Sequence, residues 1–141
     1  MPKKIVIDTS VVLKWAPSLR EEQVEEAREI YRKMKLGQLE LLAPVYLLVE
    51  CLNILVFKKK LQVSEAVETV DRFRKSGIKF VELKVMEMEQ LCRLVKKHNI
   101  SPYDAQFLVV ANNCNCPLVT ADGKFVEKCR LAMSLIDFSK Q

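Results

Sequence analysis

The sequence predicts an α/β protein in which short parallel strands form a sheet covered by helices on both faces. Short apolar runs rich in β-branched residues alternate with longer segments whose apolar residues recur at helical spacing. The first run, IVI at residues 5–7, is too short for a stable helix and is typical of a buried strand. The 141 residues include three glycines and five prolines and show no internal repeat, so we expect a single domain spanning residues 1–141.

Turn and capping residues divide the first half of the chain into strands and helices. Ser18 and Glu21 form a candidate capping box, and Gly37 supplies a helix stop. Pro44 suits the first turn of a helix, because its missing N–H needs no partner there. The expected elements are a strand at 5–7, a short helix at 11–15, a helix at 20–36, a strand at 39–43 and a helix from 44 to about 59.

The second half continues the same alternation. Ser64 is a candidate cap for an amphipathic helix that ends before Gly77, and Ser101-Pro102 opens a helix that is apolar nearly all round. The expected elements are a helix at 64–74, a strand at 78–83, helices at 86–97 and 102–113, a strand at 117–120, a short helix and a last strand at 134–137.

Composition favours a cytoplasmic protein without a membrane span. The most apolar stretch, residues 41–57, is shorter than the ~20 residues that cross a bilayer and contains Glu50 and Asn53, so we expect a buried helix there. Five cysteines, mostly in apolar patterns, indicate reduced thiols. The net charge of +5 suits an anionic partner such as RNA, although many cytoplasmic proteins are equally basic.

Four carboxylates are candidates for a metal site. Asp8 and Asp122 each follow a predicted strand, and ligands of open parallel sheets lie at the strand tips. Glu50 lies in an almost wholly apolar segment, where a buried carboxylate must be protonated, paired or bound to a metal. Asp104 lies in the first turn of a predicted helix.

Each of these carboxylates also has a purely structural interpretation. Asp8 before Thr-Ser is a good helix start, and Glu50 could reach solvent or an arginine. Asp104 completes a capping box with Ser101, and Asp122 fits an Asp-Gly turn. Because the structural account needs four separate coincidences, we predict that the four side chains converge to hold a divalent cation.

Four motifs resemble the PIN-domain family of metal-dependent ribonucleases, especially the VapC-type toxins of toxin–antitoxin systems. They are I-V-I-D-T-S at 5–10, P-x5-E at 44–50, S-P-Y-D-A at 101–105 and L-V-T-A-D-G-K-F at 118–125. The resemblance implies a three-layer α/β/α fold around a central parallel sheet of about four to five short strands. It makes the acidic quartet Asp8, Glu50, Asp104 and Asp122 both catalytic and metal-binding.

Other residues are expected around the quartet. Ser10 and Thr120 match polar family positions lining the site, and Thr9 is placed with them. Asn53 lies one turn after Glu50 on the same helix face. Whether Glu127 acts as a further acid is open.

The resemblance also implies a chemistry and partners. We expect one or two Mg²⁺ or Mn²⁺ ions supporting hydrolysis of RNA phosphodiesters, a homodimer and a small antitoxin that blocks the site. A PIN nuclease of RNA maturation or decay, a non-catalytic RNA- or protein-binding module, and a phosphatase acting on small phosphate esters are the alternatives. Lysines at a helix end are by default solvated, and the alternative is contact with the RNA backbone, for which the candidates are Lys14, Lys58, Lys59, Lys60 and Lys124.

Overall fold

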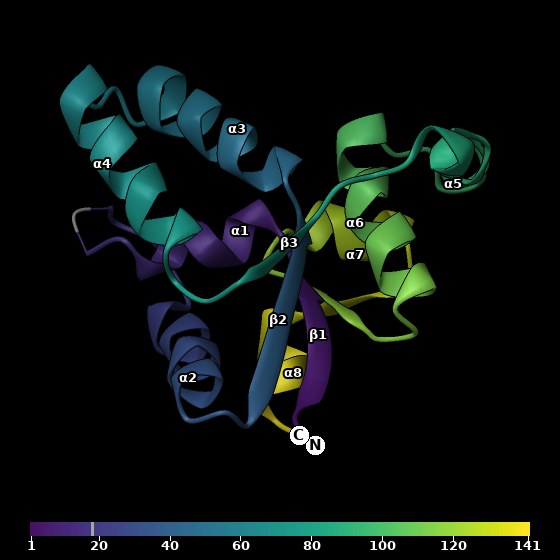
Figure 1. Cartoon of the computed structure of the whole chain (residues 1–141), viewed down its shortest axis with the longest axis horizontal. Coiled ribbons are helices and arrows are strands. Elements are labelled where there is room, and N and C mark those ends of the chain that lie inside the picture. The colour runs from purple at the N-terminus through teal and green to yellow at the C-terminus, as the bar shows by residue number, and fades with distance from the viewer. Residues whose placement is uncertain (18) are drawn as a thin grey trace.

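The computed structural model describes residues 1–17 and 19–141, and Ser18, the candidate cap paired with Glu21, lies outside these described residues (Figure 1). In the described part of the chain, five strands form one parallel sheet in the order β3-β2-β1-β4-β5. They are β1 (Lys3–Ile7), β2 (Leu39–Pro44), β3 (Lys79–Val81), β4 (Leu118–Thr120) and β5 (Ala132–Ser134). The predicted α/β fold with a central parallel sheet is confirmed.

The first strand lies at the centre of this sheet. Val6 of β1 is in register with Leu42 of β2 on one side and with Leu118 of β4 on the other. Ile5, Val6 and Ile7 are completely buried, as expected for a parallel strand covered on both faces. The residue that follows β1 therefore starts from a fixed position at the middle of the sheet's C-terminal edge.

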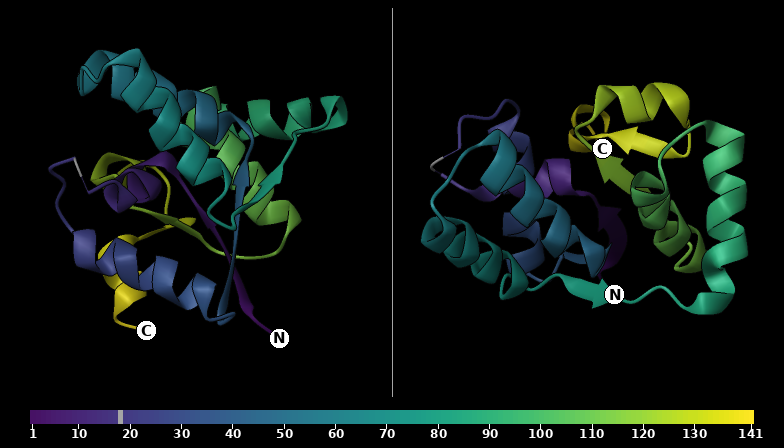
Figure 2. Two further views of the ribbon diagram at one scale, coloured as in Figure 1. Left: turned by 60° about the vertical axis from the view of Figure 1, so that its left-hand side comes forward. Right: turned by 90° about the horizontal axis from the view of Figure 1, so that it is seen from above.

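Helices cover both faces of the sheet, which gives three layers (Figures 1 and 2). The helices α2 and α8 lie against one face, and α6, backed by α5, lies against the other, while α3 and α4 stand above the C-terminal edge of the strands. The α-helices are α1 (Thr9–Val12), α2 (Val24–Lys35), α3 (Tyr46–Asn53), α4 (Val63–Arg74), α5 (Met88–His98), α6 (Pro102–Asn113), α7 (Gly123–Lys128) and α8 (Leu135–Ser139). Two 3-10 turns, η1 (Leu13–Trp15) and η3 (Val85–Glu87), and the π-helical segment η2 (Ile54–Lys58) complete the described helical structure.

Two helices begin at residues other than the predicted ones. The helix expected from Arg20 begins at Val24, because the preceding Gln23 has a left-handed backbone with φ 57° that no helix can include. The helix expected to be capped by Ser64 already includes that residue, and the extended residue before it is Gln62. The polar residues 20–23 therefore continue the helical pattern before the true start of α2, whereas α4 begins one residue earlier than predicted.

Pro44 and the predicted last strand also differ from expectation. Pro44 is the final residue of β2, in register with Val81, rather than the first turn of a helix. The strand expected at 134–137 ends where it was expected to begin, because the Ser134 hydroxyl accepts a hydrogen bond from the Asp137 N–H and starts α8.

The helical region after β2 is not buried as predicted. Leu47, Cys51 and Leu55 are completely buried and form one stripe at four-residue spacing. On the outer side Val49 is 59% exposed and Phe57 is 74% exposed. The region therefore presents an apolar outer surface as well as an apolar inner one. No helix in the described ranges is long and apolar enough to cross a membrane.

Candidate functional site

The four predicted carboxylates line one cavity at the C-terminal edge of the sheet. Asp8 follows β1, Glu50 is on α3, Asp104 is in the first turn of α6 and Asp122 precedes α7. Parallel strands end at this edge, and α6, which leads into β4, begins there, so the topology gathers positions that are far apart in sequence. The cavity has a volume of about 400 Å³, and its wall also includes Thr9 and Ser10.

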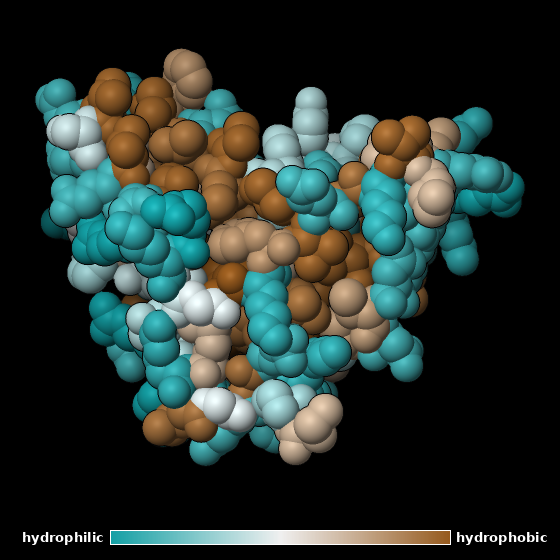
Figure 3. Space-filling model, in the orientation of Figure 1, coloured by the Kyte–Doolittle hydropathy of each residue, from teal (hydrophilic) through white to brown (hydrophobic). Residues whose placement is uncertain are grey.

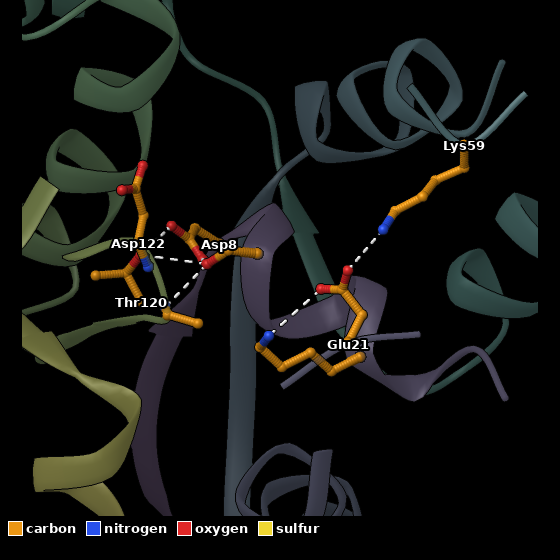
Figure 4. A network of polar contacts seen from close by, with 8 residues as sticks. Asp8, Glu21, Lys59, Thr120 and Asp122 are labelled. Atoms are coloured by element: carbon orange, nitrogen blue, oxygen red, sulfur yellow. Dashed lines mark hydrogen bonds and ion pairs between the residues drawn. The ribbon is translucent and has the colours of Figure 1, made fainter. Parts of the chain in front are cut away.

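Asp8 is the most deeply placed of the four. Asp8 is 6% exposed, and its carboxylate accepts hydrogen bonds from the hydroxyls of Ser10 and Thr120, each at 2.5 Å (Figure 4). Burial raises the pKa of Asp8 to about 7, since the hydroxyl bonds only partly offset the cost of desolvation and the Glu50 charge adds to it. Thr120, the last residue of β4, is completely buried and does not line the cavity, and its hydrogen bond connects β4 with Asp8, the residue after β1.

Glu50 is held by a residue next to Asp8. The Thr9 hydroxyl donates a hydrogen bond to the Glu50 carboxylate, which joins the start of α1 to α3. Partial burial raises the pKa of Glu50, and the charge of Asp104 raises it further. The positive charge of Lys58, at the end of η2, lowers the pKa of Glu50.

Asp104 and Asp122 combine their structural interpretation with a place in the cavity. The Asp104 backbone N–H donates to the Ser101 hydroxyl, so the capping interpretation holds for its backbone, while its carboxylate lines the cavity. The Asp122 Oδ1 atom accepts from the Lys124 and Phe125 N–H groups and caps α7. Burial raises the pKa of Asp104, and the neighbouring Asp122 charge raises it further.

Mutual repulsion connects the quartet. The charge of Glu50 raises the pKa of Asp8, that of Asp104 raises the pKa of Glu50, and that of Asp122 raises the pKa of Asp104. Among the described residues none of the four carboxylates forms an ion pair, and no three Asp, Glu, His or Cys side chains are close enough together to form a ready-made metal site. Unneutralised carboxylate oxygens beside threonine and serine hydroxyls are nevertheless the donor set that fits Mg²⁺ or Mn²⁺.

Glu21 and Lys59 form another part of the wall and, together with Lys14, which does not line the cavity, make up a cationic cluster that we call the Lys14–Glu21–Lys59 bridge (Figure 4). Glu21 Oε1 accepts from Lys14 Nζ at 3.3 Å, and Glu21 Oε2 accepts from Lys59 Nζ at 2.8 Å. Lys14, expected at the RNA backbone, is instead buried and directed to Glu21. The sequence predicted Glu21 only as part of a helix cap. The signal for its ion pair with Lys14 was the position of that lysine in the apolar run VVLKW, because a buried lysine needs a charged partner.

The remaining candidates lie outside the described cavity wall. Asn53 is exposed at the end of α3, while the wall includes its neighbour Ile54. Lys60 and Lys124 are exposed, and so is Glu127 on α7. Lys58 and Lys59 are therefore the candidate phosphate-binding lysines that line the cavity itself.

Comparison with known proteins places this geometry in a family. A search of curated proteins finds no match. Among solved structures, PAE2754 from Pyrobaculum aerophilum is 19% identical, with a TM-score of 0.66 covering 99% of this chain and 96% of that one. VapC20 from Mycobacterium tuberculosis, described as a sarcin–ricin loop cleaving toxin, is 18% identical, with a TM-score of 0.64 covering 87% and 93%. At these identities the likeness shows the fold. Because the PIN domain model matches residues 5–131, which is most of the chain, the protein belongs to the PIN-domain family.

Proposed function

We propose that this protein is a divalent-metal-dependent endoribonuclease that hydrolyses RNA phosphodiester bonds at Asp8, Glu50, Asp104 and Asp122. The observation that carries the proposal is that four carboxylates without a cationic partner in the described chain line one cavity. A protein gains nothing in stability by gathering such charges, because each raises the cost of ionising the next. Their placement is explained by a ligand that neutralises them.

The residues of the chain divide the work between them. Ser10 and Thr120 fix the Asp8 carboxylate, and Thr9 fixes Glu50, so the oxygens that would hold the ion are oriented before it binds. When bound, Mg²⁺ or Mn²⁺ would activate a water molecule and stabilise the leaving oxygen of the cleaved phosphodiester. Lys58 and Lys59 on the wall would bind the RNA backbone beside it, and Lys60 and Lys124 would extend this contact outward.

We further propose that the protein is the toxin of a toxin–antitoxin pair, with a small antitoxin protein that covers the cavity. The structural likeness to VapC20, which covers 87% of this chain, supports this role. A PIN nuclease of RNA maturation or decay has the same site, and a non-catalytic binding module would lack cleavage. A short reading frame directly upstream of the gene would support the toxin. We place the protein in the cytoplasm, where its free cysteines stay reduced.

We propose that the protein is a homodimer and that α3 and α4 form the interface. Figure 3 shows hydrophobic side chains gathered over these two helices. The exposed apolar residues on them and on the adjoining segment are Val45, Val49, Phe57, Val63 and Val67. An apolar surface of this kind is typical of a protein–protein contact.

The cleavage test compares charge-matched variants. Purified wild type is incubated with structured RNA and Mn²⁺ beside Asp8→Asn, Glu50→Gln and, as a control on the exposed side of α4, Glu68→Gln. We expect cleavage by the wild type and by Glu68→Gln, and a loss of at least about 100-fold in the other two, because each removes a ligand charge. Equal cleavage by all four proteins, or no cleavage by any, contradicts the proposed function.

A further inference from the structure

The Lys14–Glu21–Lys59 bridge places two ammonium groups on one carboxylate at the edge of the acidic cavity. The three side chains differ in exposure: Lys14 is 8% exposed, Glu21 is 18% exposed and Lys59 is 30% exposed. Burial raises the pKa of Glu21, but the bonds and charges of the two lysines outweigh it and hold that pKa below its usual value. Glu21 therefore remains a carboxylate at neutral pH, and the formal charges of the two lysines and this carboxylate sum to one net positive charge.

A second cation changes the cost of breaking the bridge. If Glu21 had Lys59 as its one partner, moving Lys59 away would leave a partly buried carboxylate unpaired, which is strongly unfavourable. Lys14 contacts the other carboxylate oxygen and keeps Glu21 paired when Lys59 leaves. The buried Lys14 thus lowers the cost of releasing the more exposed Lys59 from Glu21, so that Lys59 can bind another anion.

The position of Lys59 suits it for a ligand in the cavity. It directly follows η2, and its backbone N–H donates to the Ile54 carbonyl at 2.9 Å, which fixes the base of the side chain. Its ammonium lies on a wall that continues to Glu50 and Asp8. An RNA phosphate next to the one being cleaved would therefore lie within reach of this wall. In the structure without RNA, the Lys59 ammonium is paired with Glu21.

We propose that Glu21 holds the place of an RNA phosphate: on binding, the Lys59 ammonium exchanges the Glu21 carboxylate for a phosphate of the RNA, while Lys14 keeps Glu21 paired. This inference rests on the proposed action on RNA. Lys59 is a substrate-binding residue, and Lys14 and Glu21 are positioning residues that touch no RNA. The exchange makes and breaks ion pairs only.

The test measures binding of a fluorescent single-stranded RNA by anisotropy in EDTA, over a series of salt concentrations. We expect Lys59→Met to bind about tenfold more weakly, since it loses a charged hydrogen bond. The slope of log K against log salt should decrease in size by about 0.7, the value for one phosphate contact on a single strand. Lys59→Arg should restore both affinity and slope.

The decisive variants separate exchange from simple charge. Lys14→Met should weaken RNA binding several-fold with an unchanged slope, because Lys59 still reaches the phosphate but must leave Glu21 without a partner to do so. Lys14→Met/Glu21→Gln should recover wild-type affinity, because the carboxylate that retained Lys59 is gone and the net charge equals that of the wild type. Lys97→Met on the exposed side of α5 removes one positive charge from a residue that does not line the cavity and serves as the control.

Three results would overturn the inference. They are equal affinity of wild type and Lys59→Met (including no binding by either), Lys14→Met behaving like Lys97→Met, and no recovery in the double variant. If Lys14→Met fails to fold by circular dichroism, Glu21→Gln replaces it; this variant must bind RNA at least as tightly as the wild type, and weaker binding overturns the exchange. Because binding is measured without a metal, these outcomes are independent of whether the wild type cleaves RNA.

Discussion

Thr9 donates its hydroxyl hydrogen to the carboxylate of Glu50, 41 residues further along the chain. Thr120 does the same for Asp8, 112 residues away. Each acid is thus oriented by a threonine from a different element, and neither threonine supplies a charge. The carboxylates would therefore bind the cation, and the threonine hydroxyls would hold those carboxylates in position.

Replacing Thr120 by valine is expected to lower cleavage by about 10–100-fold without unfolding the protein, since valine keeps the shape and removes the hydrogen bond to Asp8. Initial rates of RNA cleavage at a fixed Mn²⁺ concentration measure the effect. Thr69→Val is the matched control, because Thr69 is also buried but donates its hydrogen bond within its own helix, to the Glu65 carbonyl. Equal losses in the two variants would contradict a role in aiming Asp8.

The stability of the metal-free protein is expected to decrease as pH rises from about 4 to about 7. The pKa of Asp8 is about 7 in the folded protein against an ordinary value of 3.8, so in this range the folded state retains a proton that the unfolded state has released. The raised pKa values of Glu50 and Asp104 act in the same direction. Urea unfolding in EDTA at several pH values measures this, and a stability that rises across the range would contradict the buried, unpaired state of Asp8.

Substituting Asp8 by asparagine is expected to leave the metal-free protein at least as stable as the wild type at pH 8, because it removes a buried charge repelled by Glu50. Each kcal/mol relieved corresponds to a Tm increase of roughly 3 °C for a domain of this size. Asp104→Asn should behave alike. A large drop in the Tm of both variants would show that the carboxylates are needed as structural caps.

Adding Mn²⁺ or Mg²⁺ is expected to raise the Tm of the wild type, and more at pH 8 than at pH 5, because the carboxylates must lose their protons to bind the ion. An ion concentration of 100 times Kd corresponds to about 2.7 kcal/mol of stabilisation. Glu50→Gln should show a much smaller increase, whereas Glu68→Gln should match the wild type. An equal increase in all three proteins would indicate that the ion binds elsewhere.

Introducing a charge at Val49 is expected to convert the proposed homodimer to monomers. Val49 is exposed on the outer side of α3, and Val49→Asp would bury a carboxylate in an apolar contact. Sedimentation velocity measures the oligomeric state. Val85→Asp, at an exposed apolar residue of η3, is the control; dissociation by that variant and not by Val49→Asp would place the interface elsewhere.

The sequence predicted those parts of the molecule in which one residue's environment is decided locally. The IVI run, the S-P-Y-D helix start and the apolar segment around Glu50 each carry a local signal for a strand or a helix, and the positions of Asp8, Asp104 and Glu50 follow from them. The position of Asp122 follows from the LVT strand before it. Lys14 and Glu21 could not be paired in this way, because their partnership depends on where the turn after η1 places the chain. Pro44 was misplaced for a related reason: a strand's last residue and a helix's first turn both tolerate a missing N–H.

The π-helical segment Ile54–Lys58 has a consequence for how this protein can evolve. A π turn accommodates one residue more than an α turn, so shortening this segment by a single residue would convert it to regular helix. Because the π turn has already absorbed the extra residue, the residues beyond the deletion would keep their orientation about the helix axis. Lys59 would then stay on the cavity wall, and a descendant with that deletion would retain both its acids and its lysine.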